Sequence, residues 1–240
     1  MVMCVKVGLG YSNRYGVSAN WCFVFANIVR VVKHELILAH DTHFSIDVSR
    51  NHVIRSLLPY NPDYIFIIDT DIFPLKCSST QCSIFYDVIN YMIDNYSNYD
   101  VIGVYHYSKK IEPNVYEFGE RKTLNNIDVY ELRPMKLNIN SGVHRVDAFG
   151  IGLVMIKPEI FNTLPYPWFR IEVVYDSNTK TEIVIGEDVY FFYKCRKHNI
   201  NVYVTTDIIA MHESQLYLFV DSRVFNNPFA TIFITNEKKK

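Results

Sequence analysis

Two carboxylates follow the most apolar stretch of the chain. Asp69 and Asp71 come directly after the segment from Tyr64 to Ile68, and alternate residues of an extended segment point the same way. Two hard oxygen ligands at the accessible end of a buried strand suit Mg²⁺ or Mn²⁺ carrying a diphosphate. An Asp that caps a solvated turn gives the same short pattern, so the motif indicates a metal site mainly through its place after the strand.

Two further groups have the residue types of a reaction centre. Gly186-Glu187-Asp188 opens a predicted amphipathic helix, where the macrodipole favours carboxylates and where one of them can also serve as a base. His212 comes after the last predicted strand, and a histidine there is either a structural residue or a metal ligand. Taken alone, neither group shows whether its residues have a structural or a functional role.

The elements around these groups alternate between strand and helix in the first half of the chain. Strands are predicted over residues 3–9, 35–39, 64–68 and 101–105, with helices beginning near Ser18 or Asn20, near Asp47 or Ser49, and over 79–96. This order predicts an α/β fold with a doubly wound, mostly parallel sheet and helices on both faces. Ligands of such sheets lie beyond the carboxyl ends of the strands, where Asp69 and Asp71 are found.

The second half is less regular. Residues 108–145 are polar with weak strand signals at 129–132, and a strand over 146–156 is interrupted by two glycines. A helical turn at 158–161 and a last strand at 201–204 follow. We expect one domain over 1–215, with a nucleotide-binding half (1–105) and an acceptor half (106–215), and then a C-terminal extension over 216–240.

Composition excludes several classes of function. Lys and Arg (24) nearly balance Asp and Glu (25), so no basic field is present and we expect no nucleic-acid partner. The five cysteines are scattered and odd in number, which predicts reduced and mostly buried thiols in an intracellular protein. The N-terminus does not resemble a signal peptide, and no run of 18 apolar residues occurs, so nothing is predicted to span a membrane.

The order of the motifs resembles one family, the family-2-like glycosyltransferases of the GT-A fold. The likeness extends from Val5 to His212, and the compact bacterial, archaeal and viral members also carry an Ala/Ser-Arg-Asn helix start. The matching segments here are Ser49-Arg50-Asn51, Asp69-Thr70-Asp71, Gly150-Ile151-Gly152, Pro167-Trp168-Phe169, Gly186-Glu187-Asp188 and His212. The resemblance implies a single Rossmann-like GT-A domain.

The resemblance also implies a role for each matching residue. Asp71 and His212 would bind the divalent metal, Asp69 would contact the metal or the ribose, and Asp188 would be the catalytic base. Around the nucleotide would lie Tyr11, Ser12, Asp41 and Arg50. Around the sugar and acceptor would lie Gly150, Gly152, Trp168 and Glu187.

The implied reaction is transfer of a sugar from a UDP- or GDP-linked donor to a hydroxyl of a sugar, lipid-linked or protein acceptor. Mn²⁺ or Mg²⁺ would offset the negative charge that grows on the departing diphosphate. A carboxylate across the pocket can take the proton of the attacking hydroxyl. Direct displacement inverts the anomeric centre, so inversion depends on Asp188 being the base.

Four alternatives remain open at this stage. A retaining transferase would keep the metal site, and an inactive GT-A domain would act as a binding or structural module. A sugar-nucleotide pyrophosphorylase is disfavoured because the loop after Gly8-Leu9-Gly10 is short and has Arg14 as its only cation. A hydrolase would use paired carboxylates from Asp69, Asp71, Glu187 and Asp188. Neither donor-diphosphate ligands within 176–185 nor an acceptor site within 108–145 can be assigned.

Location and assembly follow from the same features. We expect a cytoplasmic protein, in the host cytoplasm if the source is a virus. The apolar segment from Leu216 to Ile234 can pack on a second copy as a homodimer or lie loosely on a membrane. Few Gln and many Ile, Val and Tyr favour a hot-environment archaeon or its virus.

Overall fold

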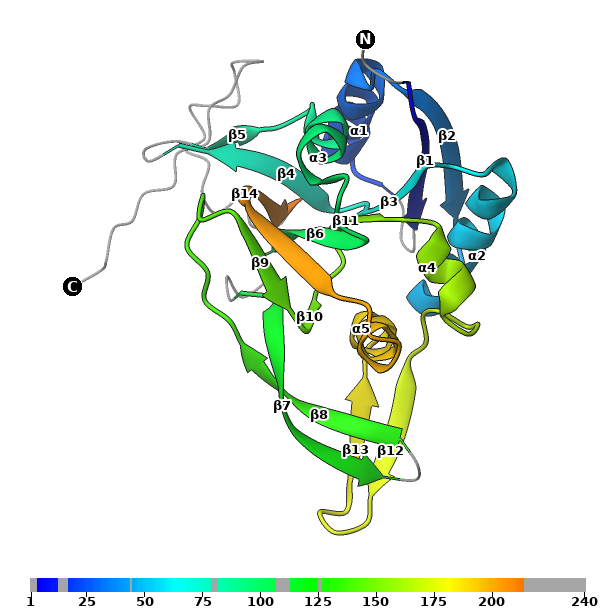
Figure 1. Cartoon of the computed structure of the whole chain (residues 1–240), viewed down its shortest axis with the longest axis vertical. Coiled ribbons are helices and arrows are strands. Elements are labelled where there is room, and N and C mark those ends of the chain that lie inside the picture. The colour runs from blue at the N-terminus through cyan, green and yellow to red at the C-terminus, as the bar shows by residue number, and fades with distance from the viewer. Residues whose placement is uncertain are drawn as a thin grey trace, which may run out of the picture.

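The computed structural model describes residues 4–12, 17–43, 45–78, 82–106, 113–124 and 127–213. Over these residues the fold is mixed α/β, built on a nine-stranded sheet. Figure 1 shows α1 and α3 on the upper side of this sheet and α2, α4 and α5 on its lower side. This arrangement is compatible with the Rossmann-like GT-A fold that the sequence implies.

The first three strands pair in parallel, as predicted. They are β1 (Lys6–Ser12), β2 (Glu35–Asp41) and β3 (Tyr64–Asp69), connected through α1 (Ala19–Val31) and α2 (Ile46–Leu57). The apolar run of β3 is buried, since helices and other strands cover both faces of a central parallel strand. The register aligns Ser12 with Asp41 on one side and with Asp69 on the other, so the three residues share one sheet edge.

Beyond β3 the sheet becomes mixed. β11 (Leu153–Ile156) lies antiparallel between β3 and β6 (Val101–His106), although the sequence predicts a parallel succession. The full order is β2-β1-β3-β11-β6-β14-β4-β5, with β9 paired to β14. The remaining strands of this sheet are β4 (Ile72–Cys77), β5 (Cys82–Ile84), β9 (Val143–Val146) and β14 (Val202–His212).

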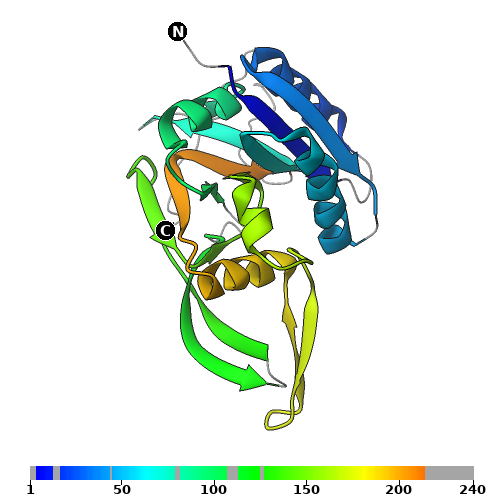
Figure 2. The same ribbon diagram turned by 45° about the vertical axis from the view of Figure 1, so that its right-hand side comes forward.

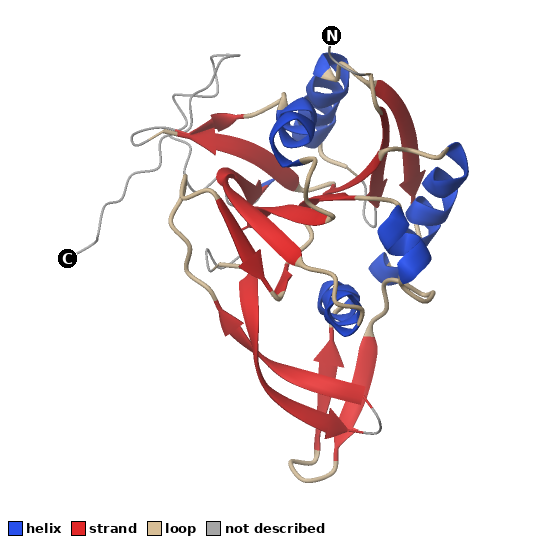
Figure 3. Cartoon of the chain, viewed as in Figure 1, coloured by secondary structure: helices blue, strands red, loops and turns tan. Residues whose placement is uncertain are grey.

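Two small sheets complete the second half. β7 (Val115–Leu124), β8 (Ile127–Pro134) and β10 (Ala148–Phe149) form one, and β12 (Glu172–Asp176) with β13 (Thr181–Ile185) forms the other. The helices here are α4 (Glu159–Thr163) and α5 (Glu187–Lys197). Figure 2 shows α5 between the main sheet and these small sheets, which project from the rest of the molecule in Figure 3.

Two sequence predictions are wrong in this region. The helix expected over 79–96 is shorter: α3 spans Val88–Tyr96 after the short strand β5, and a 3₁₀ turn covers Leu58–Tyr60. Cys77 and Cys82 are not reduced thiols, because the antiparallel register of β4 and β5 places them opposite each other and they form a disulfide. The free thiols are also mostly exposed: Cys4 and Cys22 are accessible and Cys195 is buried.

The C-terminal extension lies outside the described residues, which end at position 213. Within the part of the chain that the structure describes, no helix has both the length and the apolar character that a membrane crossing needs.

Candidate functional site

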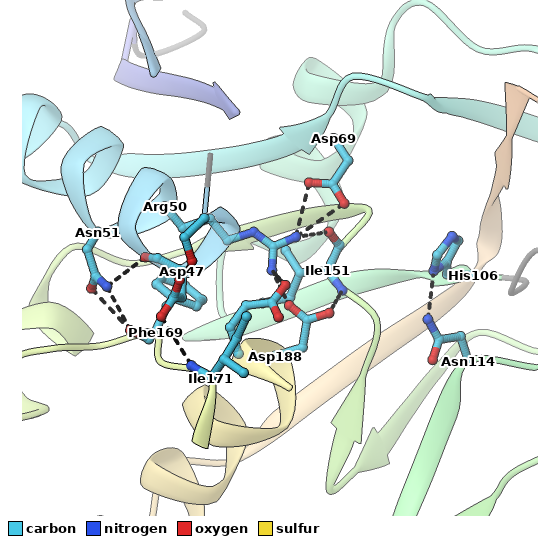
Figure 4. Close-up of polar contacts among 12 residues, drawn as sticks. Asp47, Arg50, Asn51, Asp69, His106, Asn114, Ile151, Phe169, Ile171 and Asp188 are labelled. Carbon is cyan, nitrogen blue, oxygen red and sulfur yellow. Dashed lines mark hydrogen bonds and ion pairs between the residues drawn. The ribbon is translucent and has the colours of Figure 1, made fainter. Parts of the chain in front are cut away.

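One buried arginine organises the carboxylates of the site. Arg50 lies on α2 with 2% of its surface exposed. Its Nη1 pairs with Glu187 at 3.0 Å and with Asp188, and its Nη2 pairs with Asp69 at 3.0 Å. Nη2 also donates to the carbonyl of Ile151 at 3.0 Å (Figure 4). A single guanidinium therefore joins the end of β3, the segment before β11 and the first turn of α5.

The charges around Arg50 do not cancel, because three carboxylates share one cation. Desolvation alone would lower the pKa of Arg50, but the carboxylates, led by Asp188, outweigh it and the pKa is raised. Desolvation, Asp188 and Asp71 raise the pKa of Asp69 to about 6, although Arg50 opposes this shift. Desolvation and Asp188 also raise the pKa of Glu187. The site thus carries excess negative potential, which favours a bound cation.

The backbone of residues 150–152 fixes the geometry of the carboxylates. The N–H of Ile151 donates to Asp188 at 3.1 Å, and the N–H of Asp69 donates to the carbonyl of Gly152 at 2.9 Å. A Cβ on Gly150 would lie 1.8 Å from Nδ2 of Asn114, so any other residue there would displace the Asn114 side chain. The absence of side chains at Gly150 and Gly152 thus lets the neighbouring residues pack closely against this segment.

Asp71 and His212 meet, although 141 residues separate them in the chain. Nδ1 of His212 lies 3.0 Å from Oδ2 of Asp71. Antiparallel pairing of β14 with β4 brings them together, and the N–H of Glu213 donates to the carbonyl of Asp71 at 2.7 Å. Of these two groups, the carboxylate is a donor that Mn²⁺ and Mg²⁺ prefer, whereas the imidazole suits a transition-metal ion.

A second histidine beside this pair was not predicted. His106 ends β6, and its ring centroid lies 4.8 Å from that of His212. Its side chain is buried, Nε2 has no hydrogen-bond partner among the described residues, and Nδ1 faces Asn114 at 3.3 Å (Figure 4). Burial, and then the charge of His212, lower the pKa of His106 to about 3, so the ring is neutral. The signal in the sequence was the same as for Asp69: a polar residue directly after a buried strand.

The residues predicted around the nucleotide share one edge but not one role. Tyr11, Ser12 and Asp41 lie at the carboxyl ends of β1 and β2, and Tyr11 stacks on His40 with centroids 5.6 Å apart. Arg50 is different, because its side chain is buried beneath the carboxylates. That Arg50 lies against the nucleotide stays a prediction, and the structure places its guanidinium inside the fold against three carboxylates.

Trp168 also belongs to the interior. It is 7% exposed, and its indole N–H donates to the carbonyl of Phe161 at 2.9 Å and that of Leu164 at 3.2 Å. Asn51, the neighbour of Arg50, accepts from the N–H groups of Trp168 and Phe169 at 3.0 and 3.2 Å. Trp168 thus packs in the core, and its role in the sugar and acceptor pocket stays a prediction. The Ser-Arg-Asn motif connects the two halves of the fold.

The expected metal ligands converge only in part. Among the described residues, one group of three His, Cys, Asp or Glu side chains has ligand atoms within 4.8 Å of one another, and it is Asp41, His43 and His52. Asp69 is held by Arg50, apart from the contact between Asp71 and His212. The predicted metal position therefore has two adjacent candidate ligands, Asp71 and His212.

Comparison with known proteins supports the fold. No protein-family model matches the chain, and no curated protein is similar in sequence. The crystal structure of A197 from STIV is similar over 98% of this chain and 97% of its own, with a TM-score of 0.56 and 18% identity. GalNAc-T7, crystallised with UDP, GalNAc and Mn²⁺, is similar over 88% of this chain and 44% of its own, with a TM-score of 0.46 and 9% identity. The likeness to A197 concerns fold alone, and the likeness to GalNAc-T7 is too slight to support an inference.

Proposed function

We propose that this chain is a metal-dependent glycosyltransferase that moves a sugar from a nucleoside-diphosphate donor to an acceptor hydroxyl. The observation that carries the proposal is the contact of Asp71 with His212 at the sheet edge that also presents Asp69. The motif order of the sequence supports the same class. The proposed donor is UDP- or GDP-linked, and the acceptor is a sugar, a lipid-linked molecule or a protein.

In this mechanism Asp71 and His212 would hold Mn²⁺ or Mg²⁺, with Asp69 beside them. The ion, when bound, offsets the negative charge that develops on the diphosphate as the sugar leaves. Tyr11, Ser12 and Asp41 would bind the nucleoside farther along the same edge. These residues orient the donor so that its sugar faces the carboxylates of α5.

Asp188 is proposed as the base that takes the proton of the acceptor hydroxyl, with inversion as the result. One of its oxygens contacts Arg50 and the other accepts from Ile151, which fixes the direction of the carboxylate. Each carboxylate oxygen has a further lone pair, so Asp188 can still accept a proton. Glu187, Gly150 and Gly152 would shape the sugar side of the pocket.

The remaining assignments belong to the same proposal. Residues 1–215 would form one domain, with donor binding in the first half and acceptor binding in the second, and residues 216–240 would pair two copies or contact a membrane. The proposed location is the cytoplasm, where a nucleotide-sugar donor would be present.

A thermal-shift experiment tests the proposal. UDP or GDP should raise the Tm only when Mn²⁺ or Mg²⁺ is present, since the ion joins the diphosphate to the protein. Asp71→Ala should abolish this metal dependence, and Asp94→Asn, an exposed position on α3, should preserve it. Stabilisation by nucleotide without metal, or an unchanged response in Asp71→Ala, would contradict the proposal.

A further inference from the structure

A cluster of metal-type side chains lies at the carboxyl end of β2, away from the Asp71–His212 pair. Nδ1 of His43 lies 2.7 Å from both oxygens of Asp41, and Nδ1 of His52 lies 3.7 Å from Oδ2. The two imidazole rings meet edge to face with centroids 4.4 Å apart. Three ligand atoms therefore face a common point.

His43 and Asp41 form a hydrogen-bonded pair, and His52 places a third possible ligand atom beside that pair. At 3.7 Å, the contact of His52 with Asp41 is too long for a hydrogen bond. Ligands about 2.1 Å from a tetrahedral zinc ion lie about 3.4 Å from one another. The observed 2.7 and 3.7 Å bracket this value, so small side-chain movements would complete the geometry.

Regular structure holds two of the three ligands in place. Asp41 ends β2 and His52 lies on α2, while the hydroxyl of Ser49 donates to the carbonyl of Asp41 at 3.3 Å and connects the two elements. The side chains of His43 and His52 are 52% and 41% exposed, so an ion can enter from solvent.

We propose that Asp41, His43 and His52 form a second metal site that binds a transition-metal cation of the Zn²⁺ class. Two imidazoles and one carboxylate are donors that Zn²⁺, Co²⁺ or Ni²⁺ prefers, whereas Mg²⁺ and Ca²⁺ take oxygen ligands. Three protein ligands leave a fourth position open to water or to a ligand atom of a bound molecule. The site goes beyond the proposed transfer reaction and does not depend on it.

The new site is separate from the proposed donor metal. Asp41, Ser12 and Asp69 stand in register on three neighbouring strands. Since strands are spaced about 4.8 Å apart, Asp41 lies roughly 10 Å from Asp69. A cation held by Asp41 would therefore stand at the nucleoside end of the edge and use the carboxylate proposed to contact the nucleoside. The nucleoside would then either compete with Zn²⁺ for Asp41 or bind to the ion at its open fourth position.

Zn²⁺ binding to the Asp71→Ala protein tests the proposal, because this variant lacks a ligand of the other metal position. Titration against a chromogenic chelator should show one equivalent of Zn²⁺ bound. His43→Ala/His52→Ala in the same background should weaken binding about 100-fold or more, since loss of even a hydrogen bond that orients a ligand costs about 10–100-fold. His198→Ala, an exposed histidine at the end of α5, should change nothing.

Failure of the Asp71→Ala protein to bind Zn²⁺, or equal binding by the double histidine variant, would overturn the proposal. Both histidines are partly exposed, so the double variant should fold, and an unchanged Tm without metal confirms this. Co²⁺ provides a second readout, because its visible spectrum in the Asp71→Ala protein should change on loss of His43 and His52. The Mn²⁺-dependent effect of UDP on the wild type tests the transferase separately.

Discussion

At the scale of single residues, Arg50 has the most consequences. A charge with 2% exposure is tolerated because carboxylates surround it, and those carboxylates in turn depend on it. Replacing such a network by apolar groups is often neutral, but removing one partner leaves uncompensated buried charge. Arg50 is therefore a positioning residue for Asp69 and Asp188. Loss of Arg50 would affect the site through both carboxylates.

Arg50→Met should destabilise the protein by about 3–5 kcal/mol at pH 8. This loss of stability should become smaller as the pH falls to about 6. The pKa of Asp69, about 6 against a usual 3.8, would rise further without Arg50, so the folded variant takes up protons in this window and gains stability as the pH falls. Urea unfolding in EDTA at both pH values measures this. Arg55→Met, on the exposed side of α2, is the control, and an equal loss at both pH values would contradict the prediction.

Asp188→Asn should separate chemistry from binding. The amide keeps the shape of the side chain but cannot take a proton, and a general base contributes about 10²–10⁴-fold. We expect release of UDP or GDP from a panel of nucleotide sugars to fall at least about 100-fold, while the Mn²⁺-dependent shift in Tm persists. Asp100→Asn, in an exposed ion pair with Lys157, should leave both unchanged. Full turnover by Asp188→Asn would exclude Asp188 as the base.

At the scale of elements, α2 connects the parallel strands to the second half through Asn51. Its amide donates to the carbonyl of Phe169 at 2.7 Å, and its oxygen accepts from two backbone N–H groups of the segment before β12. These buried groups have no access to water, so their pairing depends on this one side chain.

Asn51→Ala should cost about 2–6 kcal/mol, because two buried N–H groups lose their acceptor at about 1–3 kcal/mol each. Urea unfolding measures the change. Ser56→Ala on the same helix removes an exposed hydroxyl that donates to the carbonyl of His52 and should cost little. A loss at Asn51 no larger than at Ser56 would show that this connection does not stabilise the fold.

Gly103 gives a second test at this scale, because the ring of Phe149 on β10 packs against this position of β6. A Cβ on Gly103 would lie 2.2 Å from the ring of Phe149. Gly103→Ala should cost about 1–3 kcal/mol through overpacking. Phe149→Leu alone opens space, so the double variant should be more stable than the sum of the single losses predicts. Additive losses would place the strain elsewhere.

At the scale of the whole molecule, the sequence predicts the first half of the fold better than the second. The run over β3 is apolar on both faces, which marks a central strand and places Asp69 and Asp71 at its end. The antiparallel insertion of β11 could not be predicted, because pairing between distant strands leaves no local period. The disulfide of Cys77 with Cys82 was missed for a different reason: it depends on a hairpin whose second strand has only three residues and is hard to recognise in the sequence.

The site shows the same division. The joint role of Asp71 and His212 was inferred from motif order, and the structure brings the two together. The burial of Arg50 was not predicted, because no local signal reveals that Arg50 has partners 137 and 138 residues away. The cluster of His43 and His52 was missed because it combines a loop with a helix.

The small sheets should open more easily than the main sheet. β11 is buried along its whole length, with exposures of 0–1%, whereas Val173 and Val184, paired across β12 and β13, are 56% and 65% exposed. Amides with few buried neighbours exchange through local opening, and those in the core exchange only on global unfolding.

Hydrogen exchange with mass spectrometry measures this difference. Peptides covering 64–69, 101–106 and 153–156 should exchange with the free energy of global unfolding from urea. Peptides covering 172–185 should exchange at a lower free energy. Residues 187–197 of α5 should remain protected although they follow directly, since Arg50 binds Asp188 and the core encloses Phe191 and Phe192. Equal protection of the β12–β13 hairpin and β3 would mean that the projecting sheets unfold together with the main sheet.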